Sequence, residues 1–192
     1  MTAALSAGVR LFQYRNKSGT KRAVYEASLP LARIAREANA LFLVNDHADI
    51  ASAVDAAGVH LGQDDLPIEQ ARKVLGKGKL IGISTHSREQ AVEAELSGAD
   101  YIGFGPVFQT STKEAGEAQG LQMLSLVKRS VSVPVIAIGG INRTTVRDAI
   151  GAGADGVAAI SAVLSAPDIK QAAEEMLRII RDTQAHLQMM NS

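Results

Sequence analysis

A short motif, in which small residues and a glycine precede an apolar run, recurs four times along the chain and limits the folds open to it. In each copy a helical pattern stops at a glycine, which can take the left-handed conformation that ends helices, and a compact strand follows. Each copy therefore predicts a turn from a helix into a strand. The copies are SAGVRLFQ at 6–13, AAGVHLGQ at 56–63, SGADYIGFG at 97–105 and GAGADGVAAIS at 151–161.

Three further strands are predicted at 41–45, 80–84 and 135–138, where the apolar residues are continuous and do not alternate with polar ones. Such runs are typical of strands buried on both faces of a parallel sheet. Helical patterns separate the strands, and this alternation predicts right-handed β-α-β crossovers.

Seven strands are predicted, and polar or glycine-rich residues follow nearly all of them. A dinucleotide-binding sheet would instead have one glycine fingerprint after an early strand, whereas an eight-unit (β/α)8 barrel carries such residues at every strand end. We therefore expect one domain over residues 1–192, an α/β barrel of the TIM type that lacks the first strand in this chain.

The composition excludes several classes of function. Lys plus Arg and Asp plus Glu number 20 each, so no overall field attracts nucleic acid or an anionic membrane. The chain has no cysteine, which excludes disulfides and thiolate chemistry and suits a reducing compartment. No apolar run approaches the length of a membrane span, and the first ten residues do not resemble a signal peptide. We expect a cytoplasmic protein that acts on small molecules.

Barrel enzymes build their active sites at the carboxyl ends of the strands, and these ends are unusually polar here. The earlier strand ends carry amides, cations, carboxylates and hydroxyls: Gln13, Arg15, Lys17, Asn45, Asp46, His60, Gln63, Asp64, Asp65, Ser84, Thr85 and His86.

Two carboxylates, Asp46 and Asp65, follow adjacent strands. A hard oxygen site of this kind holds Mg²⁺ together with substrate phosphates. The cations Arg15, Lys17 and Lys113 could neutralise a diphosphate beside it. The pattern favours a Mg²⁺ site for a diphosphorylated substrate.

Helix capping is the alternative interpretation of these carboxylates. Asp46 or Asp49 could cap the helix expected at 48–57, and Asp64 or Asp65 could cap the helix begun by Pro67.

A second anion site is predicted where IGGIN, at 138–142, leads from a strand into a helix. Its backbone N–H groups, with the loop around Ile160 and Ser161, resemble the usual phosphate site of barrels. The alternative is a tight turn with Asn142 as the helix N-cap. The hydroxyl-rich loop Thr110, Ser111, Thr112 and Lys113 lies in a long connection, and long polar loops at this face usually contact ligands.

His60 and His86 are candidate general bases. A single histidine on a strand or loop is more often a hydrogen-bonded structural residue, so we expect neither to be catalytic.

Six motifs, in this order and spacing, resemble the thiamine phosphate synthase family over nearly the whole chain. The most discriminating is the fifth of the set, which has the form G-P-V-F-x-T-x-T-K. The six are Q-Y-R-N-K at 13–17, N-D at 45–46, G-V-H-L-G-Q-D-D at 58–65, G-I-S-T-H at 82–86, G-P-V-F-Q-T-S-T-K at 105–113 and A-I-G-G-I-N at 137–142.

The resemblance implies a TIM barrel that joins 4-amino-5-hydroxymethyl-2-methylpyrimidine diphosphate to a thiazole phosphate and releases diphosphate. It implies catalytic roles for Arg15, Lys17 and Lys113 and Mg²⁺ ligands at Asp46 and Asp65. It implies pyrimidine diphosphate contacts at Gln13, Arg15, Lys17, Asn45, Ser84 and Lys113, and thiazole phosphate contacts at Thr110, Thr112, Gly139, Gly140, Ile160 and Ser161.

Three alternatives stay open at this point. A thiazole tautomerase relative would share the barrel and the phosphate site, but it has no evident need for the Q-x-R-x-K and T-x-T-K motifs. A non-catalytic paralogue would bind phosphorylated ligands without turnover. A sugar-phosphate isomerase would not need two carboxylates together with a diphosphate clamp. The family begins with a strand and helix ahead of Gln13, so we expect a gap in this barrel, which a homo-oligomer or a further segment could cover.

Overall fold

The computed structural model describes residues 1–110 and 116–190. Within these residues seven strands alternate with helices. The strands are β1 (Leu11–Tyr14), β2 (Leu41–Asn45), β3 (Gly58–Leu61), β4 (Leu80–Thr85), β5 (Tyr101–Phe104), β6 (Val135–Ala137) and β7 (Gly156–Val157).

Helices follow the strands, and one helix precedes β1. They are α1 (Thr2–Ser6), α2 (Lys21–Glu37), α3 (Ala48–Ala53), α4 (Ile68–Leu75), α5 (Arg88–Leu96), α6 (Gly120–Ser130), α7 (Val146–Gly151), α8 (Ser161–Leu164) and α9 (Ile169–Met190).

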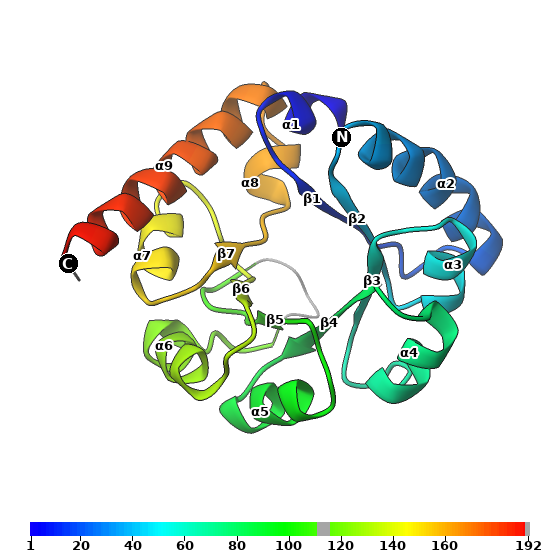
Figure 1. Cartoon of the computed structure of the whole chain (residues 1–192). Helices are drawn as coiled ribbons and strands as arrows, with labels where there is room; N and C mark the ends of the chain where they lie inside the picture. The colour runs from blue at the N-terminus through cyan, green and yellow to red at the C-terminus, as the bar shows by residue number, and fades with distance from the viewer. Residues whose placement is uncertain (111–115, 191–192) are drawn as a thin grey trace.

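The strands form one parallel sheet in the order β1-β2-β3-β4-β5-β6-β7, so each strand pairs with its neighbour in the sequence. Figure 1 shows the strands at the centre of the molecule with the helices arranged around them. The predicted architecture is confirmed: the described residues build an α/β barrel with seven parallel strands. In the sheet, β1 and β7 are the two end strands, and outside it α1 packs against α9.

The outer face of the sheet is the apolar one. Strand residues such as Phe42, Val59 and Phe104 pack with helix residues such as Leu124 and Ile150 into one core cluster. Burying this face against the helices is the main contribution to stability, because burial of apolar surface dominates folding.

The inner face is mostly small and polar. Gln13, Asn45, His60 and Ser84 hydrogen-bond to side chains of other strands, and Leu43, although fully buried, is not part of the outer cluster. Successive side chains of a strand point to opposite faces of the sheet, so every second residue lies on the inner face. The polar set therefore gathers inside the sheet, toward the ends of the strands.

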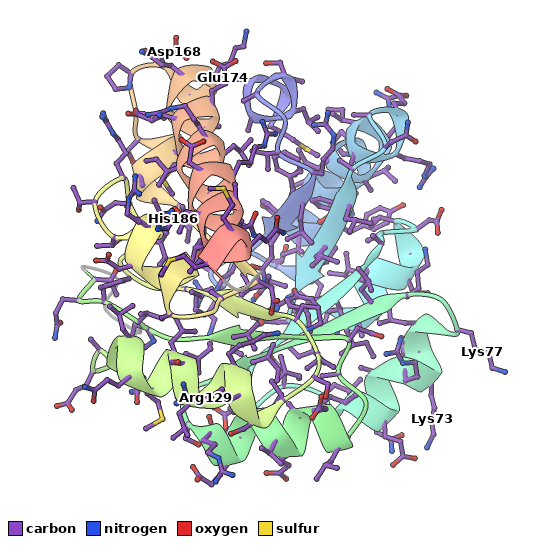
Figure 2. All side chains as sticks on the ribbon, turned by 60° about the vertical axis from the view of Figure 1, so that its left-hand side comes forward. Lys73, Lys77, Arg129, Asp168, Glu174 and His186 are labelled. Carbon is purple, nitrogen blue, oxygen red and sulfur yellow. The ribbon has the colours of Figure 1, made fainter. Side chains whose placement is uncertain are left out.

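Helix α9 packs along the outside of the barrel against α1, α7 and α8. Its buried residues include Ala173 and Met176. Figure 2 shows its length, with Asp168 and Glu174 near the start and His186 near the end, while Lys73 and Lys77 project at the lower right of the view. None of the helices in the described part of the chain combines the length and apolar character that a bilayer span requires.

Two elements are shorter than their sequence patterns predict. The helix expected at 48–57 ends at Ala53, and Asp55 takes a left-handed φ of 52° in the turn that follows. The apolar run that follows Gly156 continues to Ile160, but the last strand ends at Val157. Because β7 is an end strand, it has only the ladder with β6 in the described sheet, and the last bond of that ladder runs from Ala158 N–H to Ala137 O.

Candidate active site

A chain of side-chain hydrogen bonds links the ends of β1 and β2. Gln13 Nε2 donates to Asn45 Oδ1 at 2.8 Å. Asn45 is nearly buried, and its Nδ2 donates in turn to Asp46 Oδ1. The two amides therefore hold one oxygen of the Asp46 carboxyl in a fixed direction.

The carboxyls of Asp46 and Asp65 lie together at the ends of β2 and β3, as the sequence predicts. Asp46 has a left-handed φ of 66°, and its N–H donates to His60 O at 2.8 Å. Asp65 Oδ2 accepts the Gly62 N–H at 2.6 Å. Aspartate tolerates the left-handed region better than most residues, because its short side chain can hydrogen-bond locally.

Burial raises the pKa of Asp46, and so do the hydrogen bond and the negative charge of Asp65. The positive charges of Lys17 and Arg15 act in the opposite direction. Two carboxyls this close compete for one proton when no cation lies between them. The same geometry suits a cation, which would remove the repulsion.

Two carboxylates are too few for a metal site made of protein ligands alone, but they suit Mg²⁺. Magnesium keeps several waters and binds through one or two carboxylates and substrate phosphates. Among residues 1–110 and 116–190 no group of three or more His, Asp or Glu side chains could hold a metal on its own. A Mg²⁺ ion at this site would be held by Asp46 and Asp65 together with oxygens of a phosphorylated substrate.

The capping interpretation is wrong for Asp46 and Asp65. The N-cap residue of α3 is His47 and that of α4 is Pro67. Asp49 lies in the first turn of α3 and forms an exposed ion pair with Lys21 at 2.8 Å. The carboxyls of Asp46 and Asp65 face each other, so they are available for a metal.

His60 is buried in the interior of the sheet with both ring nitrogens hydrogen-bonded. Nδ1 lies 2.7 Å from the Tyr101 hydroxyl and Nε2 lies 2.8 Å from Ser84 Oγ. Burial lowers the pKa of His60 to about 4, although the charge of Asp65 acts against this shift. Burial also raises the pKa of Tyr101, so both rings are neutral near pH 7.

We expect His60 to make the metal-free protein sensitive to acid. The unfolded chain binds a proton at His60 near pH 6.5, whereas the folded protein binds it only near pH 4. Stability from this residue is therefore complete above pH 6.5 and is lost as the pH falls to 4, which amounts to about 3 kcal/mol. Urea unfolding of wild type and His60→Gln over this range measures the difference. Parallel pH profiles for the two proteins would contradict the prediction.

His86 lies at the end of β4, where its Nδ1 is 2.5 Å from Gly105 O and its backbone N–H donates to Gln90 Oε1 at 2.7 Å. Ser87 is the N-cap of α5, and its Oγ accepts the Gln90 N–H. In both contacts His86 binds groups of the protein, as a structural residue does.

The glycine turn after β6 is shaped to lie against the loop after β5. Gly139 and Gly140 have φ values of 84° and 67°. A Cβ on Gly139 would lie 2.5 Å from Pro106 Cβ, and one on Gly140 would lie 2.6 Å from Gln109 O. Only glycine provides both the left-handed backbone and the space.

Backbone hydrogen bonds tie the same two segments together. Val107 N–H donates to Ile138 O at 2.8 Å and Phe108 N–H donates to Gly139 O at 3.2 Å. Thr110 therefore follows directly from a loop that is anchored on the glycine turn. Ser111, Thr112 and Lys113, the rest of the hydroxyl-rich loop that is predicted to contact ligands, lie outside the described residues.

The remaining phosphate candidates lie after β7, the neighbour of β6. Ile160 is exposed and is the N-cap of α8, which begins at Ser161. Asn142 does not cap α7, whose N-cap is Thr145. Its Oδ1 accepts the Thr144 N–H at 2.8 Å and so stabilises the turn that precedes the helix.

Sequence reasoning missed one residue of this inner network, Tyr101, and did not show what Gln63 contacts. Tyr101 begins a strand that reads as apolar, and only the register places its hydroxyl against His60. Gln63 Nε2 donates to Ser84 O at 2.7 Å. A signal for Tyr101 was present in the sequence, since two glycines, at 82 and 103, interrupt neighbouring buried strands.

The fold and the strand-end chemistry define the class: this is an α/β-barrel enzyme that acts on small molecules. A family model described as thiamine monophosphate synthase matches residues 1–163. The chain belongs to the thiamine monophosphate synthase family and is a transferase, which confirms the resemblance of the six motifs.

Curated relatives carry the same name. The thiamine-phosphate synthase of Methanosarcina barkeri is 48% identical over 181 residues, which cover 94% of this chain and 82% of the relative. That of Shouchella clausii is 44% identical over 183 residues, which cover 95% and 88%.

Solved structures agree with the sequence comparisons. Thiamine phosphate pyrophosphorylase from Pyrococcus furiosus has a TM-score of 0.87 and 43% identity, covering 94% of this chain and 87% of that chain. The 3-hexulose-6-phosphate synthase of Salmonella typhimurium, with a TM-score of 0.72 and 18% identity, covers 95% and 91% and shares the fold alone.

Proposed function

We propose that this chain is a Mg²⁺-dependent thiamine-phosphate synthase that joins 4-amino-5-hydroxymethyl-2-methylpyrimidine diphosphate to 4-methyl-5-hydroxyethylthiazole phosphate. The observation that carries the proposal is the pairing of the Asp46 and Asp65 carboxyls next to the charges of Arg15 and Lys17. A substrate with one phosphate does not need this combination, whereas a departing diphosphate does.

The reaction needs a leaving group that is stabilised and a nucleophile that is positioned. The bond from the pyrimidine methylene carbon to diphosphate oxygen breaks, and its electron pair leaves with the diphosphate. The amino group of the pyrimidine stabilises the resulting methylene cation, and the thiazole nitrogen then forms the new carbon–nitrogen bond. Because no proton has to be removed to start this sequence, the site needs no strong general base.

The residues divide between these tasks. Gln13, Asn45 and Ser84 would bind the pyrimidine diphosphate, and Arg15, Lys17 and Lys113 would neutralise its diphosphate. Bound Mg²⁺ would supply a further positive charge to the leaving oxygens. The glycine turn with Thr110, Thr112, Ile160 and Ser161 would hold the thiazole phosphate. This division is supported by the positions of the described members at the strand ends.

The test is product formation from the two substrates with purified protein, with and without Mg²⁺. We expect thiamine phosphate and one diphosphate per turnover, and loss of turnover when the metal is chelated. Isomerisation of a thiazole phosphate without coupling would support a tautomerase instead. Binding of thiazole phosphate without any product would support a non-catalytic relative. A cytoplasmic location and a homo-oligomeric state stay predictions, and the mass in solution measures the second.

A further inference from the structure

Three adjacent strands bring Tyr101, His60 and Ser84 into one hydrogen-bonded row. His60, Gly82 and Tyr101 are Cα partners across β3, β4 and β5. Ser84 and Gly103 are partners two residues further toward the carboxyl ends of the strands. The row therefore starts in the barrel interior and ends at Ser84, on the side where substrates bind.

Two glycines make this contact possible. A Cβ on Gly82 would lie 2.0 Å from the Tyr101 ring, so any side chain there would displace the tyrosine. A Cβ on Gly103 would lie 3.0 Å from His60 Cε1. With both side chains absent, the two rings meet across β4 with centroids 5.5 Å apart.

The hydrogen bonds in this row have one direction that satisfies every donor. Within the described residues, the Tyr101 hydroxyl forms its hydrogen bond with His60 Nδ1, at 2.7 Å. A buried hydroxyl that keeps its proton must donate it, because an unsatisfied buried donor is costly. Nδ1 is then the acceptor, and the single ring proton of neutral His60 lies on Nε2.

That ring proton determines what Ser84 can do. His60 Nε2–H donates to Ser84 Oγ over 2.8 Å. The Ser84 hydroxyl is thereby an acceptor toward His60, and its own proton points elsewhere. Ser84 is only half-buried, so the proton can reach a ligand at the strand ends.

We propose that Tyr101 and His60 are positioning residues, which fix the Ser84 hydroxyl as a hydrogen-bond donor toward an acceptor atom of the pyrimidine diphosphate. The inference rests on the function proposed above and adds two residues that touch no substrate. Removing the Tyr101 hydroxyl frees His60 to take either neutral form, and the direction of the Ser84 proton is lost.

The tautomer of His60 is the first test, and it does not depend on turnover. We expect ¹⁵N NMR of the imidazole at pH 7 to show a protonated Nε2 and an unprotonated Nδ1 in wild type. We expect a mixture of the two neutral forms in Tyr101→Phe. A protonated Nδ1 in wild type would overturn the proposal whatever the enzyme's activity.

Kinetics form the second test. We expect Tyr101→Phe to raise KM for the pyrimidine diphosphate about tenfold, the effect of one well-placed hydrogen bond, with KM for the thiazole phosphate unchanged. The double variant Tyr101→Phe/Ser84→Ala should have the same KM for the pyrimidine diphosphate as Ser84→Ala alone, because Tyr101 and His60 act only through Ser84. Fully additive losses, or equal increases in both KM values, would overturn the proposal.

Two further variants separate positioning from general damage. Tyr25→Phe makes the same chemical change on the exposed side of α2 and should leave both KM values unchanged. His60→Gln places an amide donor near the Nε2 position, so its KM should stay closer to wild type than that of His60→Ala. If wild-type His60 carries its proton on Nε2 but the protein forms no thiamine phosphate, the proposed synthase activity is contradicted, whereas the hydrogen-bond direction inferred for the row still holds.

Discussion

We expect Asp46→Asn to lower kcat/KM for the pyrimidine diphosphate by about 10²–10³-fold, the usual loss when one stabilising group is removed from a developing charge. Asparagine has the shape of aspartate and also tolerates the left-handed backbone that Asp46 adopts at φ 66°. The substitution therefore removes the charge and leaves the turn intact. Initial rates over a range of Mg²⁺ concentrations measure both the loss and the shift in metal dependence.

The neighbouring carboxylate at residue 64 offers a matched control. Asp64 is exposed, whereas Asp65 is half-buried beside Asp46. Asp64→Asn should therefore keep the wild-type rate and the wild-type Mg²⁺ dependence. An Asp46→Asn enzyme whose Mg²⁺ dependence matched wild type would show that the metal is held elsewhere.

The largest loss of stability is expected from Gly58→Ala. An added Cβ at Gly58 would lie 1.9 Å from Leu80 O, the backbone of the neighbouring strand, which no side-chain movement can relieve. The strands β3 and β4 would have to separate at their first pair, Gly58 and Leu80. We expect the free energy of unfolding to fall by about 3 kcal/mol or more, measured by urea unfolding.

Gly151→Ala provides the comparison for this prediction. Gly151 is the last residue of α7, and an added Cβ there would meet no atom within 4 Å. Alanine in a helix restricts the unfolded chain without strain, so this variant should be unchanged or more stable by about 0.4–1 kcal/mol. Equal destabilisation by the two substitutions would show that the close approach of β3 and β4 does not require a glycine at position 58.

The sequence predicts the strands and the metal pair well, for simple physical reasons. Parallel strands buried on both faces leave continuous apolar runs, and the glycines that end helices mark where several of them begin. Asp46 and Asp65 follow neighbouring strands, and the carboxyl ends of parallel strands meet at one edge. Their proximity therefore follows from the order of the elements alone.

The hydrogen-bonded row of Tyr101, His60 and Ser84 and the exact ends of the elements could not be predicted from the sequence in the same way. Tyr101 reaches His60 only because Gly82 is its partner across β4, and this pairing is a matter of register. A strand pattern shows alternation but does not show which residue of the next strand lies opposite. Strand β7 ends early because β6 is its one partner in the described sheet. The sequence of a strand does not show how many partners it has.

The strand order β1 to β7 follows the chain without exception, and this has a consequence for how the two proposed substrates share the protein. Apart from Lys113 and the positioning residue Tyr101, every residue proposed for the pyrimidine diphosphate and the metal precedes residue 86, and every residue proposed for the thiazole phosphate follows residue 109. On the proposed assignment, each half of the chain would recognise mainly one reactant. Substitutions in one half could then alter the preference for one substrate and leave recognition of the other in place.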